Sequence, residues 1–140
     1  MAAMGKLLWR RSTGVWLGTL VLFCFVVTQV IFVTVPTEAA ARFLRVVFPA
    51  YYGVGVIAGI VALLGSLMRM KRQDQRALWW ILGTTGLAWL LVLWARYILS
   101  LMNHLPPSSP AFLRLHSESI ALNAIVGMLL IGGFVIESWT

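Results

Sequence analysis

The chain has 140 residues, of which 61% are hydrophobic and 11% are charged, and its mean hydropathy is +0.92. This composition excludes an ordinary soluble domain of this length and predicts an integral membrane protein. The formal net charge of +7 does not indicate a nucleic-acid partner, because the basic residues stand between apolar runs and so report membrane orientation instead.

Four apolar segments are each long enough to cross about 30 Å of hydrocarbon as a helix. They cover residues 13–35, 49–68, 78–102 and 111–137. The first follows Lys6, Arg10 and Arg11, as the core of a signal peptide would, but it exceeds the roughly 7–15 residues of such a core, and three further spans follow. We therefore predict a retained first helix and an all-α, integral membrane four-helix bundle in one domain, residues 1–140.

Two prolines divide the segment between the first two spans. Pro36 is expected to end the first helix, and Pro49 suits the first turn of the second, where its missing amide hydrogen costs nothing. Residues 38–48 between them are predicted to form a short helix along the membrane interface. Gly14 with Gly18, and Gly55 with Gly59, have the spacing that lets helices approach closely, and we expect them to pack inside the bundle.

The basic residues at the ends of the predicted spans indicate the orientation of the chain. One side of the membrane receives seven of them and the other side three. The larger group consists of Lys6, Arg10, Arg11, Arg69, Lys71, Arg72 and Arg76, and the smaller of Arg42, Arg45 and Arg114. Because cytoplasmic loops carry the excess of lysine and arginine, both termini are predicted to be cytoplasmic.

The fourth span opens with an unusually polar stretch, FLRLHSESIALN. On a helical wheel Arg114 and Glu118 share one face and form an i, i+4 pair, expected to lie at the surface, while His116, Ser119 and Asn123 share another face. The third span carries a matching stripe that includes Arg96 and Asn103. We therefore predict an outer-leaflet polar cluster that would bind a ligand or partner, consisting of Arg96, Asn103, His116, Ser119, Asn123 and Gln29.

Structural roles are alternatives for each of these residues. Arg96 could extend to the headgroups or pair with Glu118. Ser119 and Asn123 could form interhelical hydrogen bonds, and His116 could bond a backbone carbonyl. Gln29 could bridge two helices.

Chemistry at this cluster has a weaker basis. Cys24 is the single cysteine, so neither an intramolecular disulfide nor a cysteine-based zinc site can form, and a thiol nucleophile would need a base that its own helix lacks. We assign no catalytic residues. Haem or copper ligation through His116, alone or with His104, is the alternative hypothesis. It takes second place because two histidines without tight spacing are a weak signal for a metal site.

Three motifs resemble a known family of small membrane proteins. They are Phe48-Pro49-x-Tyr51-Tyr52, the pair Arg96 and Asn103, and Phe112-x-x-Leu115-His116-x-x-Ser119-x-x-x-Asn123. Together they resemble four-helix proteins of unknown function similar to transmembrane protein 205. More distantly they are similar to copper-resistance protein D and the bacterial membrane-bound protoporphyrinogen oxidase, whose histidines can serve metal or haem. The resemblance implies a shared polar set of Arg96, Asn103, His116, Ser119 and Asn123, and it implies no reaction.

The leading functional hypothesis is a non-enzymatic membrane protein that serves as an accessory or scaffold subunit, or binds a small ligand through the polar cluster. Its expected partners are the lipid bilayer and other membrane subunits. The alternative is a haem or metal protein in electron transfer or transport. An independent transporter is disfavoured, because four short spans leave little room for alternating access.

Overall fold

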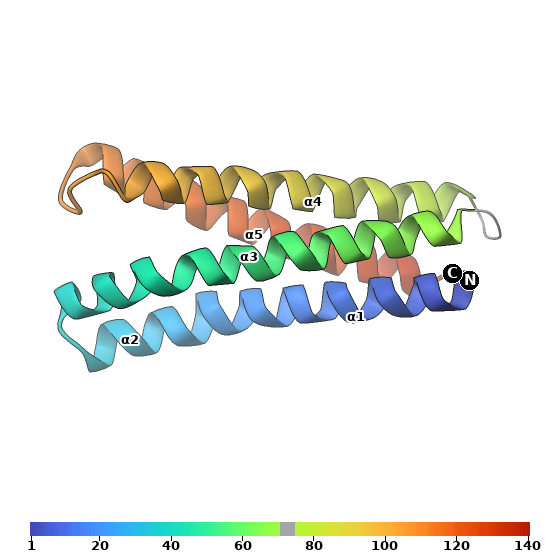
Figure 1. Cartoon of the computed structure of the whole chain (residues 1–140), viewed down its shortest axis with the longest axis horizontal. Helices are drawn as coiled ribbons and strands as arrows, with labels where there is room; N and C mark the ends of the chain where they lie inside the picture. The colour runs from blue at the N-terminus through green and yellow to red at the C-terminus, as the bar shows by residue number, and fades with distance from the viewer. Residues whose placement is uncertain (71–74) are drawn as a thin grey trace.

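The computed structural model describes residues 1–70 and 75–140, and this part of the chain contains helices and turns but no strand. The elements are α1 (Ala2–Val21), the π-helix η1 (Leu22–Val27), α2 (Thr28–Thr34), α3 (Thr37–Arg69), α4 (Gln75–Met102) and α5 (Pro110–Ser138). Because α1, η1 and α2 follow one another without a break, they form a single rod, and the fold is a bundle of four long helical rods (Figure 1).

All four rods are long and apolar enough to cross a membrane: Ala2–Thr34, Thr37–Arg69, Gln75–Met102 and Pro110–Ser138. This supports a multi-pass membrane protein. At 1.5 Å per residue, a rod of 33 residues is about 50 Å long and exceeds a hydrocarbon core of about 30 Å, so its ends reach the headgroup layers.

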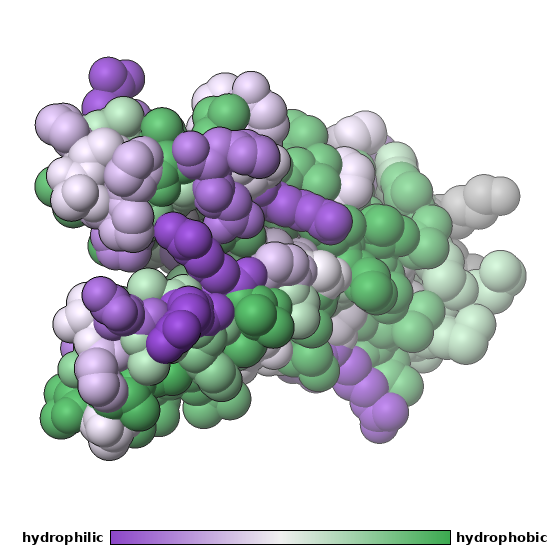
Figure 2. Space-filling model, turned by 60° about the vertical axis from the view of Figure 1, so that its left-hand side comes forward, coloured by the Kyte–Doolittle hydropathy of each residue, from purple (hydrophilic) through white to green (hydrophobic). Residues whose placement is uncertain are grey.

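Both chain ends lie at one end of the bundle, which we call the termini end; the α2–α3 and α4–α5 connections lie at the other, the loop end (Figure 1). Hydrophilic side chains gather at the loop end, while the sides of the bundle are mainly hydrophobic (Figure 2). The basic residues of α1 therefore lie at the same end as Arg69. Lys71 and Arg72, on which the orientation prediction also relies, lie outside the described residues.

The expected break at Pro49 is absent, and this part of the prediction is wrong. Helix α3 runs from Thr37 to Arg69 with Pro49 inside it, so residues 38–48 are not a separate helix. The packed face explains the continuity: Leu44, Phe48, Tyr51 and Tyr52 follow helical spacing across the proline and are buried or packed against the core. Their packing keeps the helix continuous through a residue that removes one backbone hydrogen bond.

Helix α5 begins where the sequence predicts it. Pro110 occupies the first turn, and the Ser109 hydroxyl accepts a hydrogen bond from the Phe112 amide at 3.2 Å. This is the N-cap expected from a serine that precedes a proline. The cap fixes the start of the polar stretch that follows.

The core has two parts. Near the termini end, Trp9 packs with Ala62 and Ile81 and donates its indole hydrogen to Thr85 Oγ1 at 3.0 Å. The larger part, in the middle of the bundle, is built around Trp16 and the two tyrosines of α3. Gly55 and Gly59 face Trp16, and Gly59 also faces Trp89, so the prediction that these glycines pack inside the bundle is confirmed.

The first pair of glycines behaves differently. A Cβ at Gly18 would meet no atom within 4 Å, and one at Gly14 would reach only the Phe134 ring at 3.9 Å, so neither makes close helix packing. Helices α1 and α3 approach each other closely at Gly5 and Gly65 instead. A Cβ at Gly65 would lie 2.8 Å from the Gly5 carbonyl oxygen and 2.9 Å from the Trp9 amide nitrogen.

Gly65→Ala is therefore expected to destabilise the bundle by about 1–2 kcal/mol, because the added carbon meets backbone that cannot rotate away. The measurement is the free energy of unfolding in mixed detergent and dodecyl sulfate micelles. Gly83→Ala is the matched control, since its Cβ would enter open space and alanine favours the helix. Equal losses in both variants would contradict the close approach of α1 and α3.

Candidate functional site

A hydrogen-bonded cluster joins α3 to α5 in the loop-end half of the bundle. The Tyr51 hydroxyl donates to Asn123 Oδ1 at 2.7 Å, and Asn123 Nδ2 donates to the Tyr52 hydroxyl at 3.0 Å and to the Ser119 carbonyl at 2.9 Å. The Tyr52 and Ser119 hydroxyls lie 3.0 Å apart. We call Tyr51, Tyr52, Ser119 and Asn123 the tyrosine–asparagine cluster.

Aromatic side chains and the π-helix close this cluster toward α1. Phe23 stacks on Tyr51 with ring centroids 5.0 Å apart, and Phe48 packs against both tyrosines. In η1 the Thr28 hydroxyl donates to the Phe23 carbonyl, five residues back, at 2.9 Å. Cys24, in the same wide turn, packs against the core. The polar atoms of the tyrosine–asparagine cluster therefore satisfy one another, with Tyr51, Tyr52 and Asn123 buried and Ser119 partly buried.

The structure brings together only two of the six residues predicted to form the outer polar cluster. Ser119 and Asn123 belong to the tyrosine–asparagine cluster, with the two tyrosines as their partners. The other four predicted residues are exposed on the surface of the bundle: Gln29, Arg96, Asn103 and His116. Ser119 and Asn123 thus form hydrogen bonds between helices, as the structural alternative for these two residues predicted. The remaining four residues do not enter the interior.

The charged pair at the start of α5 forms as the sequence indicates. Arg114 Nε lies 3.2 Å from Glu118 Oε1, and both side chains are exposed, which confirms the surface i, i+4 pair. Arg96 has no ion pair with Glu118 among the contacts of the described residues. His116 is exposed and stacks on Phe112, with ring planes 10° apart.

The two histidines predicted as metal or haem ligands lie on the surface of the bundle. His104 and His116 are both exposed, and within residues 1–70 and 75–140 no group of three or more histidine, cysteine, aspartate or glutamate side chains could hold a metal ion. The haem or copper alternative therefore stays a prediction that rests on resemblance.

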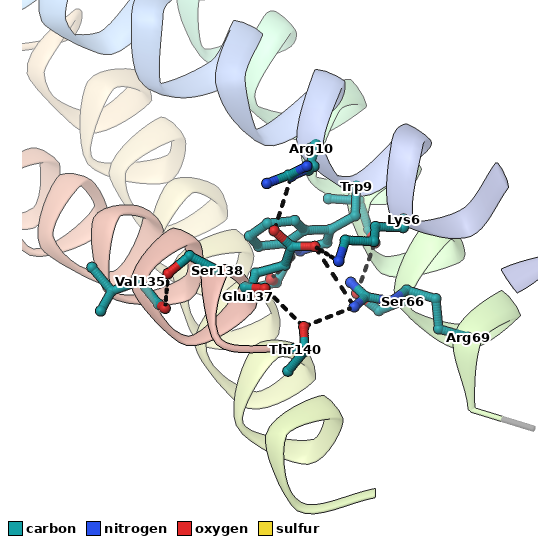
Figure 3. A network of polar contacts seen from close by, with 11 residues as sticks. Lys6, Trp9, Arg10, Ser66, Arg69, Val135, Glu137, Ser138 and Thr140 are labelled. Carbon is teal, nitrogen blue, oxygen red and sulfur yellow. Dashed lines mark hydrogen bonds and ion pairs between the residues drawn. The ribbon is translucent and has the colours of Figure 1, made fainter. Parts of the chain in front are cut away.

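A second polar site lies at the termini end and was missed in the sequence. The Glu137 side chain is fully buried, and three cations from two other helices surround it (Figure 3). Glu137 Oε2 lies 2.9 Å from Arg10 Nε, and Oε1 lies 3.2 Å from Lys6 Nζ and 3.8 Å from Arg69 Nη2. We call these four residues the Glu137 cluster.

The contacts in this cluster are ion pairs without ideal hydrogen-bond alignment, because neither carboxylate oxygen has a hydrogen bond of good geometry. Their strength therefore comes from charge and burial. Arg69 is as buried as Glu137, with a side chain only 1% exposed, and its guanidinium also donates to Thr140 Oγ1 at 3.5 Å. In low-dielectric surroundings such a pair is sensitive to the loss of either partner.

Helix electrostatics explains why these charges pair between helices. Glu137 stands in the last turn of α5, where the helix dipole disfavours a negative charge, and Lys6 stands near the start of α1, where it disfavours a positive one. Placing them side by side removes both penalties. In the sequence, Glu137 is recognisable as an acidic residue that directly follows an apolar run of 13 residues, Ala124 to Ile136. It also lies at the end of the predicted bundle that holds most of the basic residues.

A cavity of about 130 Å³ also lies at the termini end, lined by Met70, Gln75, Leu78, Trp79 and Leu82. Its lining is mainly apolar, and it contains none of the predicted site residues.

Comparison with known proteins identifies a family but no characterised relative. The model of a domain of unknown function, DUF4149, matches residues 12–107, which is more than half of the chain and includes most of the first rod, α3 and α4. No curated protein and no solved structure matches the chain. The match ends before α5, so Ser119, Asn123 and Glu137 lie outside it. The chain belongs to the DUF4149 family.

Proposed function

We propose that this protein is a non-enzymatic subunit of a membrane assembly and that it recognises a neighbouring membrane protein through polar groups on the outside of its helices. The observation that carries the proposal is the division of polar side chains between interior and surface. Inside, the tyrosine–asparagine cluster and the Glu137 cluster pair their own groups. Outside, Gln29 and Arg96 are exposed within two of the candidate membrane spans.

Exposed polar groups at membrane depth favour a protein partner over lipid tails. A glutamine amide that faces hydrocarbon leaves its hydrogen bonds unmade, and an arginine there must reach the headgroups or find a partner. Another membrane helix with an amide, hydroxyl or carboxylate would satisfy either residue, as interhelical hydrogen bonds do within bundles.

The first rod provides a further argument. No residue from Leu22 to Thr34 is buried, although this part contains many large apolar side chains. Its packing inside the bundle is therefore limited to one side, and most of its surface is open to a neighbouring helix. The subunit role has more support than binding of a small ligand at Ser119 and Asn123, since those groups already pair with each other and with the tyrosines.

The resemblance to proteins similar to transmembrane protein 205 is part of this proposal. Its most specific pattern contains Ser119 and Asn123, which would hold α5 against α3 in those proteins too. Arg96, Asn103 and His116 of the same pattern would then form the outward, partner-facing part.

Photo-cross-linking in native membranes tests this function. A photo-reactive amino acid placed at position 29 or 96 is expected to give protein adducts of defined mass, because these positions would face a partner helix. Ile57 and Met128, which are exposed and apolar, are the matched control positions. Arg96→Ala should lower the yield of the adduct formed from position 29 only if the same partner contacts both positions.

Two results would contradict the proposal. One is an adduct pattern at positions 29 and 96 that equals the pattern at the control positions. The other is a lone monomer when the protein is extracted with its surrounding lipid from native membranes and its mass is measured.

A further inference from the structure

The Glu137 cluster contains more positive charge than its carboxylate balances. Three cations surround one buried carboxylate, and the two on α1 reach the surface. The Arg10 side chain is 52% exposed and that of Lys6 31% exposed, whereas Arg69 is buried. The surplus positive charge is therefore presented at the edge of the bundle, along α1.

Glu137 also fixes the two exposed cations in place. Arg10 contacts the carboxylate through Nε, which leaves its two terminal guanidinium nitrogens without a contact to Glu137 among the described ion pairs. Because a lysine or arginine loses considerable side-chain entropy when it is immobilised, a pair already held by a carboxylate can bind an anion at a lower cost. Guanidinium and ammonium groups together suit a phosphate, which accepts several charge-assisted hydrogen bonds.

Tryptophans place this edge at the level of lipid headgroups. Trp139, two residues after Glu137, is 82% exposed, and Trp79 and Trp80 in the first turns of α4 are exposed at the same end of the bundle (Figure 1). Exposed tryptophans gather at the boundary between hydrocarbon and water. Lys6 and Arg10 lie in the first turns of α1, at the end of a rod that is longer than the hydrocarbon core is thick.

We propose that Lys6 and Arg10 form a binding site for the phosphate of an anionic phospholipid headgroup, with Glu137 as the residue that positions them. A membrane lipid is the occupant that these observations favour, because the site lies beside apolar, tryptophan-bordered surface and not in a water-filled pocket. The site is at the opposite end from the exposed His116 and its neighbours, so it is independent of the proposed subunit contacts.

Lipid selectivity can be measured with the full chain reconstituted in vesicles. Brominated phosphatidylglycerol quenches tryptophan fluorescence, and its association relative to brominated phosphatidylcholine gives a preference. The wild type is expected to prefer phosphatidylglycerol. Arg10→Gln and Lys6→Gln are each expected to lower the preference about fivefold, the factor that corresponds to roughly 1 kcal/mol for the loss of one hydrogen bond to the lipid phosphate.

Arg11→Gln is the matched control, because Arg11 is an exposed neighbour on the same helix with no ion pair to Glu137 among the described contacts. It should change the preference by less than about twofold, since it removes surface charge but not the site. Lys6→Gln provides a second test if Arg10→Gln folds poorly. In Lys6→Gln, Arg10 and Arg69 still neutralise Glu137.

Three outcomes would overturn the proposal. The first is an unchanged preference in both Lys6→Gln and Arg10→Gln. The second is an equal loss in Arg11→Gln, which would indicate diffuse surface charge. The third is loss of the preference when inorganic phosphate is added but not when chloride of equal ionic strength is added, which would indicate a site for the free ion.

Discussion

Glu137→Gln is expected to lower the free energy of unfolding by about 3 kcal/mol, the lower part of the range for breaking a buried ion pair. The reason is that the substitution removes the buried carboxylate that faces Arg69, whose side chain is 1% exposed. Lys6 and Arg10 can turn toward water when the carboxylate is gone, which keeps the loss from being larger. Unfolding in mixed micelles, followed by tryptophan fluorescence and by circular dichroism, measures the change.

Glu118→Gln is the control for this experiment, because it removes the same charge from an exposed i, i+4 pair. Such pairs contribute about 0.2–0.5 kcal/mol, so this variant should unfold nearly as the wild type does. A loss below about 1 kcal/mol in Glu137→Gln would show that the buried carboxylate does not hold α5 to α1 and α3.

Asn123→Ala is expected to destabilise the protein by about 2–3 kcal/mol. Interhelical hydrogen bonds in membrane proteins contribute about 0.6 kcal/mol on average and at most about 1.7, and this substitution removes bonds to both tyrosine hydroxyls and leaves a small cavity. The same unfolding measurement applies. The Asn123→Ala variant should also be cleaved faster by protease in the loop between α4 and α5, because α5 would be held less firmly against α3.

Asn103→Ala supplies the comparison for Asn123→Ala, since Asn103 is exposed and should contribute less than about 0.5 kcal/mol. Tyr51→Phe should fall between the two, because it removes one hydroxyl and keeps the ring that stacks on Phe23. Equal stability of Asn123→Ala and Asn103→Ala would mean that the tyrosine–asparagine cluster does not join the helices.

The two internal clusters have different consequences for function. The tyrosine–asparagine cluster is largely buried and satisfies its own polar groups, so its effect on function would be indirect, through the position of α5. The Glu137 cluster is buried on one side and exposed on the other, so it both stabilises the bundle and presents cations at the membrane surface. Substitution of Glu137 is therefore expected to change both stability and lipid selectivity, whereas substitution of Arg11 or Glu118 should change neither appreciably.

The sequence predicted local features well because their causes are local. Hydropathy over about 20 residues located four spans, and α4 and α5 agree with the expected segments within a few residues at each end. The cap at Ser109 and the pair of Arg114 with Glu118 depend on residues three or four positions apart, which helical geometry brings together in any fold.

Pro49 shows where a local argument failed. A proline after a short amphipathic segment predicts a new helix, yet the aromatic face of α3 continues across it and packs against Phe23 of the first rod. That packing depends on residues from another helix. The sequence close to Pro49 therefore cannot predict that the helix continues through it. The residues of the predicted polar cluster lie apart for a similar reason. A helical wheel groups His116 with Ser119 and Asn123, but the position of the neighbouring helix decides which of these side chains are buried.

The sequence by itself determined that this is an all-α chain with four candidate membrane spans, where α5 begins, and that basic residues concentrate in the N-terminal segment and the loop between the second and third spans. Only the tertiary structure decided that Asn123 binds two tyrosines about 70 positions away and that Glu137 draws together Lys6, Arg10 and Arg69. The physical reason is that helix formation follows from neighbours along the chain, whereas the pairing of buried polar groups depends on which helices lie side by side and at what depth.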